Sequence, residues 1–517
     1  MKPKKLIALL LLFCLAGSLL LASCETDDES SAPESVSGET SWVSEYQNQN
    51  GDYVATTSGK RYDGETITFL TCGEEPFYES EIVPNIETYE NGAEQTYPQI
   101  INDDLKLRAD DLEDKLGLKL EEIQYHSPVR KNGEMLQYIV QGNLSSTEDY
   151  QVVVPCLYDG ATLALDGHLY NLLDLEGLQI NAPWWNKDFN DSMTYADQLY
   201  FTIGDIGLVN KSCTQALFFN YDVWKKYDLT EEYGGNPYEL VRNGKWTVDV
   251  VFEAAKLLSN DLNSDNKIDY SDEFGWSGQL DDMWSIFFGS GEKIASADAD
   301  GYPMITMYNE RSANVMEKLQ DFVQGNGYYV SANDYFGVTK YPVELTREAF
   351  TTGRTLFFND AVGTVAKLGV MEQHFGVVPE PKFDESQDGY HSLVNPWGAS
   401  CFAIPVCVVG EKLQMTVDAL NVLGASSKNT IAKDYQETVL SYMKTRDDES
   451  AEMINEYILP TRACDIGMVY QWGGLDILLQ DMAKQPVGSF ASNFEAKKTA
   501  AETALSETVD FYKQNEK

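Results

Sequence analysis

A dense run of oxygen-bearing side chains between residues 261 and 272 has the spacing of a calcium-binding loop. Such loops place oxygen ligands at positions 1, 3, 5, 9 and 12 and a backbone carbonyl at position 7. Asn266 stands where glycine is usual, and Asn tolerates the left-handed conformation better than most residues. Asp272 replaces the usual bidentate glutamate. The pattern predicts a structural Ca2+ ion, with a solvated acidic turn as the alternative, and its ligands are Asp261, Asn263, Asp265, Lys267, Asp269 and Asp272.

Aromatic side chains form the second group of residues that could bind a ligand, since the chain is 12% aromatic and has 9 Trp and 30 Tyr. Rings can cover the C–H faces of a sugar while carboxylates and amides bond its hydroxyl groups, and Tyr and Trp suit semi-polar surfaces. For every aromatic candidate the alternative role is packing in the core. For the acidic candidate, Asp205, the alternative is a turn or a helix cap. The candidate ligand-binding residues are Tyr158, Trp184, Trp185, Asp205, Trp397, Tyr470 and Trp472.

The position of each candidate along the chain indicates whether ligand binding or core packing is its more plausible role. Trp184 and Trp185 are adjacent and cannot share one face of a strand or helix, so at most one of them should reach a ligand. Trp397 and Trp472 stand in irregular segments, where aromatic residues are less often core. Tyr158 follows a predicted strand, at the end that would open into a ligand site.

Motifs of catalysis are missing from the sequence. The four histidines are scattered without metal-ligand spacing, and there is neither a nucleophile elbow nor a phosphate-binding loop. A glycosidase needs only two positioned carboxylates. With 82 acidic residues, that class of enzyme stays open at this point. The net charge of −44 excludes a nucleic-acid-binding protein, which needs a basic surface.

The N-terminus has the pattern of an export signal. A short basic region precedes the apolar run 6–22, which is somewhat short for a membrane span. The run ends in Leu21-Ala22-Ser23-Cys24, which resembles the bacterial lipobox. That resemblance implies lipidation of Cys24, cleavage after residue 23, and a location on the extracellular face of the cell membrane. An ordinary cleaved signal or an uncleaved anchor is the alternative.

The composition changes abruptly after the lipobox. Residues 24–60 are polar and acidic and are expected to form a flexible tether, because they cannot bury enough apolar surface to offset their ordering entropy. Six further cysteines follow, and none forms a Cys-x-x-Cys pair. We expect buried thiols, although an exported protein can also form disulfides. The six are Cys72, Cys156, Cys213, Cys401, Cys407 and Cys464.

Strands alternate with helices between residues 66 and 155, which predicts an α/β fold with a parallel sheet covered on both faces. Further strands and helices follow in the rest of the chain. Its length from about residue 61 to 517 exceeds one typical core and suggests two lobes. Strands are expected at 66–70, 118–125, 150–155, 199–203, 216–220, 355–358, 375–379 and 402–405. Helices are expected at 103–116, 134–141, 246–258 and 310–324 and through most of the chain after 417.

Several segments, taken together, resemble the family 1 extracellular solute-binding proteins of ABC transporters, a family that includes sugar-binding lipoproteins. Each segment is weak alone, but their order covers about 67–472. The segments are Pro183–Asn186, Leu199–Asp205, Leu217–Asn220, Tyr238–Val241, Gly244–Thr247, Phe350–Phe358, Phe375–Lys382 and Asn395–Pro405.

The resemblance implies a two-lobed periplasmic-binding-protein-like (type II) fold with a ligand cleft between the lobes. It places lobe 1 at 61–205 with 382–428 and lobe 2 at 206–381 with 429–517, and crossings near Ile203–Ile206, Pro379–Pro381 and Lys428. The implied protein is a monomer that closes on a mono- or oligosaccharide and delivers it to an ABC-type permease. It needs no organic cofactor and is not an enzyme.

Three other functions stay open beside this one: a lipid-anchored surface glycosidase, a receptor for a peptide or another non-sugar solute, and a lipoprotein that senses or adheres.

Overall fold

The computed structural model of the chain describes residues 45–73, 80–84, 99–126, 131–325, 327–442 and 448–516. Trp42–Lys517 forms one compact unit. The predicted signal, Cys24 and the first part of the tether lie outside the described residues. Within the described residues, no helix combines the length and the hydrophobicity that a bilayer span requires.

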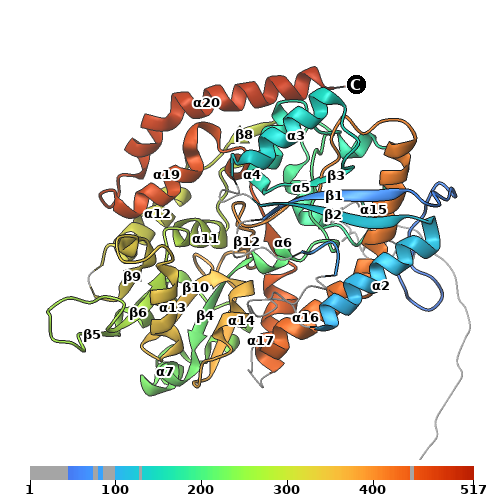
Figure 1. Cartoon of the computed structure of the whole chain (residues 1–517). Helices are drawn as coiled ribbons and strands as arrows, with labels where there is room; N and C mark the ends of the chain where they lie inside the picture. The colour runs from blue at the N-terminus through green and yellow to red at the C-terminus, as the bar shows by residue number, and fades with distance from the viewer. Residues whose placement is uncertain are drawn as a thin grey trace, which may run out of the picture. The chain divides into compact units, whose positions relative to one another are not determined.

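The first sheet contains three parallel strands in the order β2-β1-β3. Their bounds are β1 Thr66–Gly73, β2 Lys119–His126 and β3 Val152–Val154. The chain moves to one side of β1 and then to the other, so right-handed crossovers place the intervening helices on opposite faces. These helices are α2, Gln99–Leu116, and α3, Glu134–Ser145 (Figure 1). All three predicted strands of this region are confirmed.

The second sheet is mixed, with strand order β11-β4-β10-β6-β5 and β9 paired to β6. β6, β9 and β10 are mutually parallel, whereas β4 is antiparallel to β10 and β11. The bounds are β4 Gln215–Asn220, β5 Ser259–Asn260, β6 Glu273–Gly278, β9 Tyr329–Ser331, β10 Thr355–Ala361 and β11 Phe375–Val378.

Further helices cover the two sheets. In the first two thirds of the chain they are α4 Leu157–Leu165, α5 Lys187–Met193, α6 Val209–Ser212, α7 Tyr221–Lys226, α8 Leu229–Tyr233, α9 Pro237–Arg242, α10 Val248–Lys256, α11 Asp282–Gly289 and α12 Glu310–Val323. In the last third they are α13 Val343–Thr351, α14 Val365–Leu368, α15 Glu411–Asn429, α16 Ile431–Tyr442, α17 Asp448–Glu452, α18 Ile466–Val469, α19 Leu475–Asp481 and α20 Phe490–Gln514.

Four short strands form two pairs outside these sheets. β7 Ala295–Ala297 pairs with β8 Pro303–Ile305, and β12 Ser392–Leu393 pairs with β13 Arg462–Ala463. The predicted strands at 199–203 and 402–405 form isolated bridges instead of strands: Phe402 pairs with Thr202, Ala403 with Val153, and Pro405 with Leu169.

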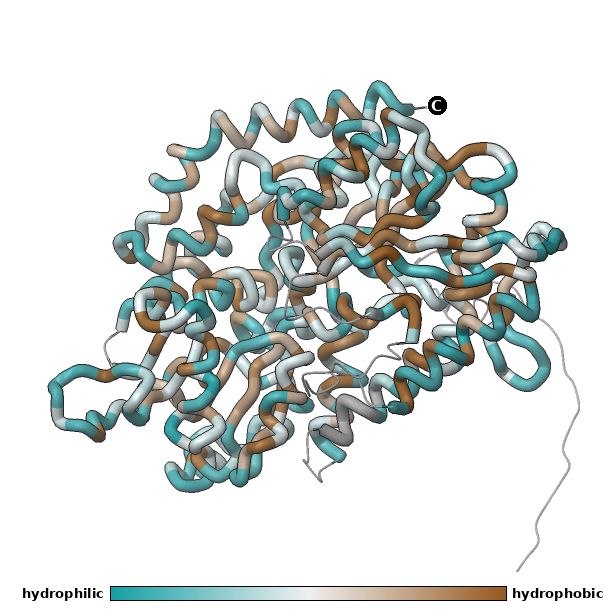
Figure 2. The backbone as a smooth tube through the Cα atoms, in the orientation of Figure 1, coloured by the Kyte–Doolittle hydropathy of each residue, from teal (hydrophilic) through white to brown (hydrophobic). Residues whose placement is uncertain are grey.

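Aromatic residues build much of the core around the second sheet. Trp276 of β6 packs edge-on against Phe252 of α10 and Phe322 of α12, whose rings stack at 3.9 Å. Hydrophobic residues gather along the strands of both sheets (Figure 2). Gly275 lets α10 approach β6 closely, because a Cβ there would lie 1.9 Å from the carbonyl oxygen of Ala255.

Residues 45–60 are not part of a free tether, contrary to the prediction. The ring of Tyr46 packs edge-on against Trp184 at 5.5 Å. The backbone N–H of Tyr53 donates to Asn429, and that of Ser58 donates to Asp418, at 2.8 and 2.9 Å. The segment is polar in composition, but specific partners on α15 satisfy its backbone and hold it in place.

The predicted lobe boundaries stay a prediction, but the contacts near one predicted crossing are informative. Near Pro379–Pro381 the chain still follows the second sheet, since Trp246 Nε1 donates to Pro379 O at 3.0 Å. Backbone bonds to the first sheet begin later, where Ala403 bridges Val153. A crossing near Asn395 fits these bonds better than one near Pro379–Pro381.

Two of the predicted buried thiols have clear surroundings. The Sγ atoms of Cys401 and Cys464 lie 3.7 and 3.6 Å from the carbonyl oxygens of Pro155 and Val394. Burial raises the pKa of both thiols. Both side chains therefore behave as small hydrophobic residues in the core.

Candidate functional site

Polar side chains gather where the strands of both sheets end. Asp281 follows β6, Asn333 follows β9, and Asp360 is the penultimate residue of β10. Tyr158 follows β3 in the first turn of α4. The carboxyl ends of parallel strands in open α/β sheets are the usual place for a ligand. The charges of Asp281 and Asp476 both act on Tyr158, which places these groups close together.

Asp281 is the centre of this group. Its Oδ1 accepts a hydrogen bond from Gln480 at 2.7 Å, and its Oδ2 accepts one from Asn395 at 3.0 Å. Burial raises the pKa of Asp281 to about 6, and the charge of Asp360 adds to the rise. We call Tyr158, Asp281, Asn395, Asp476 and Gln480 the strand-end cluster.

Asp476 brings an unused acceptor to the cluster. It is 1% exposed, and its Oδ1 has no hydrogen-bond partner among the described residues. Its Oδ2 accepts from Gln471 at 3.0 Å. Burial raises the pKa of this carboxyl. A buried acceptor without a donor costs free energy, so a ligand hydroxyl that donates to Oδ1 would remove that cost.

Trp397 supplies an exposed aromatic face next to these polar groups. It is 44% exposed, whereas every other tryptophan in the described part of the chain is at most 5% exposed. Asn395 Oδ1 accepts from the backbone N–H of Trp397 at 3.0 Å, while its Nδ2 donates to Asp281. One amide therefore ties the loop that carries the tryptophan to the central carboxylate.

Tyr158 is held within the cluster. Its side chain is buried, and Lys131 Nζ lies 4.4 Å from its ring centroid. Burial, followed by the charges of Asp476 and Asp281, raises the pKa of its hydroxyl. The neutral hydroxyl is thus available as a hydrogen-bond donor. Among the predicted ligand residues, Tyr158 and Trp397 belong to this region.

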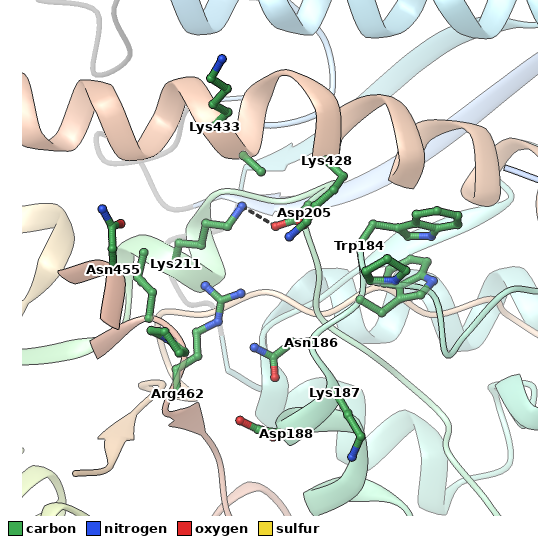
Figure 3. A pocket seen from close by; sticks show the side chains of 15 residues that line it. Trp184, Asn186, Lys187, Asp188, Asp205, Lys211, Lys428, Lys433, Asn455 and Arg462 are labelled. Atoms are coloured by element: carbon green, nitrogen blue, oxygen red, sulfur yellow. Dashed lines mark ion pairs between the residues drawn. The ribbon is translucent and has the colours of Figure 1, made fainter. Parts of the chain in front are cut away.

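Trp184, Trp185 and Asp205 lie elsewhere, around a cavity of about 400 Å³ (Figure 3). We call it the Asp205 cavity. The indole of Trp184 is fully buried and packs so closely on α15 that a Cβ on Gly424 would lie 2.2 Å from it. It offers no face to a ligand. Asp205 is engaged in ion pairs with Lys211 and Lys428 at 2.7 and 3.1 Å.

Tyr470 and Trp472 pack beneath the C-terminal helix. Trp472 is 1% exposed, and its Nε1 donates to Thr508 of α20 at 2.9 Å. The Tyr470 hydroxyl lies 3.2 Å from that of Tyr512, and its ring stacks on Phe201. Both rings have the core-packing role that was their alternative.

Sequence reasoning missed Asp281, Asp476 and Gln480. Asp281 follows β6, whose sequence has two glycines and no clear alternation, so no strand was expected there. Asn395 stood within a segment of the family resemblance but was not chosen. The available signal was its place two residues before Trp397, a spacing at which an Asn side chain bonds the backbone.

The predicted calcium loop joins β5 and β6 and is mostly hydrophilic, with short hydrophobic stretches (Figure 2). Its carboxylates accept hydrogen bonds from the loop backbone, for example Asp261 from Ser264 and Asn266. Asn266 has the expected left-handed conformation, with φ 65°. Within the described residues, no three His, Cys, Asp or Glu side chains are arranged to hold a metal ion. The calcium ion stays a prediction.

No protein-family model matches the chain, and no curated protein matches it. Among solved structures, an ABC substrate-binding protein from Listeria monocytogenes in complex with cycloalternan matches with a TM-score of 0.50 at 12% identity, over 86% of this chain and 99% of its own. Maltose-bound MalE3 of T. maritima gives 0.48 at 14% identity, over 87% and 99%. A maltose/maltodextrin-binding domain MalE from Bdellovibrio bacteriovorus, bound to maltotriose, gives 0.47 at 12%, over 85% and 99%.

At these identities the likeness shows the fold. The chain is an α/β protein with the fold of the ABC substrate-binding proteins, and the predicted fold class is confirmed.

Proposed function

We propose that this chain, which has the fold of the ABC substrate-binding proteins, binds an extracellular carbohydrate at the strand-end cluster and delivers it to an ABC-type permease. The observation that carries the proposal is the link from exposed Trp397 through Asn395 to Asp281. It joins an exposed aromatic residue to a half-buried carboxylate at the carboxyl end of a parallel strand.

The chemistry of this region suits a sugar. A pyranose has apolar C–H faces that can stack on the Trp397 ring, and hydroxyl groups that can donate to Asp281 and Asp476. Gln480 and Asn395 add amides, which both donate and accept hydrogen bonds. A strongly anionic ligand fits less well, because both carboxylates would repel it.

The proposed role is binding without turnover. Asp281 is bonded by two amides, which orient its oxygens as acceptors. The solved structures that share the fold are named as substrate-binding or sugar-binding proteins, bound to cycloalternan, maltose or maltotriose. Delivery requires that the ligand is released intact, so hydrolysis of a glycan would contradict the proposal.

Attachment through Cys24 is the second part of the proposal. It is supported by Leu21-Ala22-Ser23-Cys24 directly after an apolar run. A lipid at this residue would keep an exported binding protein beside its permease. Mass spectrometry of the chain isolated from membranes tests this, because lipidation adds the mass of a diacylglyceryl group to a peptide that begins at residue 24.

The ligand can be found with a soluble form, residues 24–517 with Cys24→Ser. A panel of glycans, amino acids and peptides is added, and the melting temperature is measured, since a ligand that binds only the native state raises it. We expect one class of oligosaccharide to raise it and to be recovered intact. A shift by peptides alone would contradict the carbohydrate ligand, and recovery of cleaved glycan would contradict the binding role.

A further inference from the structure

The Asp205 cavity has an excess of positive charge, since five basic side chains and only two carboxylates, Asp188 and Asp205, line it. Lys211 of α6 and Lys428 of α15 both pair with Asp205, and Arg462 of β13 points toward the same group (Figure 3). The electrostatic effect of Arg462 on Asp205, and of Asp205 on Arg462, confirms that the two are near neighbours. Asp188 also lines the cavity and acts on Arg462, so Lys211, Lys428 and Arg462 are balanced by two carboxylates.

These charges are largely withdrawn from water. The side chains of Lys211 and Asp205 are 4% and 8% exposed, and Arg462 is 7% exposed. Arg462 Nε has no hydrogen-bond partner among the described residues. Burial lowers the pKa of Lys211 and of Arg462. A buried cation without a full set of partners is costly.

The strong pairing of Asp205 leaves it unable to neutralise the third cation. Burial acts to raise the pKa of Asp205, but Lys211 and Lys428 outweigh it and lower the value to about 2. Asp205 is therefore fully ionised at neutral pH, and a single carboxylate cannot contribute more than one negative charge. Asp188 is the other carboxylate that acts on Arg462. Three cations and two carboxylates leave one positive charge in excess, which an anionic ligand would balance.

We propose that the Asp205 cavity binds a phosphate group beside Arg462, Lys211 and Lys428. The planar guanidinium donates two parallel bonds to oxyanions, and lysine contributes a point charge that suits the same oxygens. Asn186 also projects into this space (Figure 3). The excess positive charge contrasts with the net charge of −44 of the whole chain, so it is a local feature of this cavity.

The phosphate group has two possible sources, inorganic phosphate and a phosphate ester of a small molecule. A cavity of about 400 Å³ has room for more than the phosphate group alone. This site uses none of the residues of the strand-end cluster. It does not depend on the proposed carbohydrate function.

Residues 24–517 with Cys24→Ser, dialysed free of phosphate and sulfate, provide the test. Sodium phosphate, glucose 6-phosphate and sodium chloride are added at equal ionic strength, and melting temperature and calorimetric affinity are measured. We expect phosphate to raise the melting temperature more than chloride does. Tighter binding of glucose 6-phosphate would identify an ester as the ligand, and equal binding would identify the free anion.

Variants locate the site. Arg462→Gln and Lys428→Gln each remove one charge, and each should weaken phosphate binding by at least about 10-fold, since bonds to charged groups are strong. Lys428 is 32% exposed, so its variant should fold even if the Arg462 variant does not. Lys60→Gln is the control, because Lys60 is an exposed lysine paired with Glu411.

The outcomes separate clearly. Equal shifts by phosphate and chloride would overturn the proposal, as would unchanged phosphate affinity in Lys428→Gln. A loss of affinity in Lys428→Gln but not in Lys60→Gln would support it, whether or not a carbohydrate is ever found.

Discussion

Trp397 and Asp281 show how two ordinary residues become a candidate site through one shared neighbour. Neither has an unusual sequence context. Asn395 bonds the backbone of the first and the carboxylate of the second. Because both bonds come from one planar amide, the backbone of Trp397 and the half-buried carboxylate of Asp281 have fixed relative positions.

Replacement of Trp397 by Ala should weaken carbohydrate binding by about 10-fold or more, because the stacking face and its apolar contact area are lost. Isothermal titration calorimetry with the oligosaccharide from the ligand screen measures this. Tyr308→Ala is the matched control, since Tyr308 is 47% exposed and stacks on Phe494. Equal losses in both variants would remove Trp397 from the site.

Carbohydrate affinity should fall as the pH is lowered through about 6. Burial raises the pKa of Asp281 to about 6, and only the ionised carboxylate accepts from two amides and a ligand hydroxyl together. One pH unit below the pKa, about a tenth of the groups are ionised, so affinity should be roughly 10-fold lower. Titrations between pH 5 and 7.5 measure the change. Asp281→Asn should bind weakly and without this pH step; an unchanged step would assign it to another group.

At the scale of elements, α15 connects distant segments. Asp418, on its buried side, accepts from the backbone and hydroxyl of Ser58 and from Tyr62. Asn429, its last residue, bonds the backbone of Tyr53 through both side-chain atoms. Residues 45–60 are therefore held by the helix rather than by their own hydrophobicity.

Asp418→Ala should destabilise the protein by about 1–3 kcal/mol, because it leaves donors from Ser58 and Tyr62 without an acceptor. Urea unfolding measures the loss. Limited proteolysis should then cut within residues 45–60 at concentrations of protease that spare the unchanged chain. Equal resistance of the two chains would mean that the segment is held by other contacts.

The loop between β5 and β6 provides a second test at this scale. If it binds Ca2+ through the residues predicted from its spacing, calcium should raise the melting temperature and magnesium should not. Asp265→Ala should abolish the shift, because it removes a ligand. Asp249→Ala is the control, since Asp249 is an exposed acid on α10. A calcium shift that survives Asp265→Ala would refute the site.

At the scale of the whole molecule, several carboxyl groups are largely withdrawn from water. Burial raises the pKa of Glu380 to about 8 and those of Asp281 and Asp465 to about 6. The folded chain therefore keeps protons that the unfolded chain has lost. Because the unfolded state binds fewer protons between about pH 4 and pH 8, the free energy of unfolding decreases as the pH rises through that range.

We expect the chain to be more stable in urea at pH 5.5 than at pH 8.5, with each group contributing on the order of 1 kcal/mol. Glu380→Gln should reduce this difference, because a neutral amide replaces a carboxyl that stays protonated in the folded state. Asn359 can still donate to the new side chain, as it does to Glu380. Greater stability at pH 8.5 than at pH 5.5 would contradict the expectation.

The sequence alone determined the alternation of strands and helices and, through order and spacing of short segments, the fold. Hydrophobic periodicity is local, so 66–70, 216–220 and 355–358 could be recognised as strands. β6 could not, because Gly275 serves a close approach to α10 that only the fold creates.

Tertiary structure alone decided which aromatic residues are available to a ligand. The sequence does not distinguish a tryptophan in the core from one in a binding site. The burial of a tryptophan depends on neighbours that are distant in sequence. Trp184 meets Gly424, and Trp472 meets Thr508, so both are core. Trp397 meets no such cover, and the acceptors beside it come from residues 281 and 476, which only folding brings together.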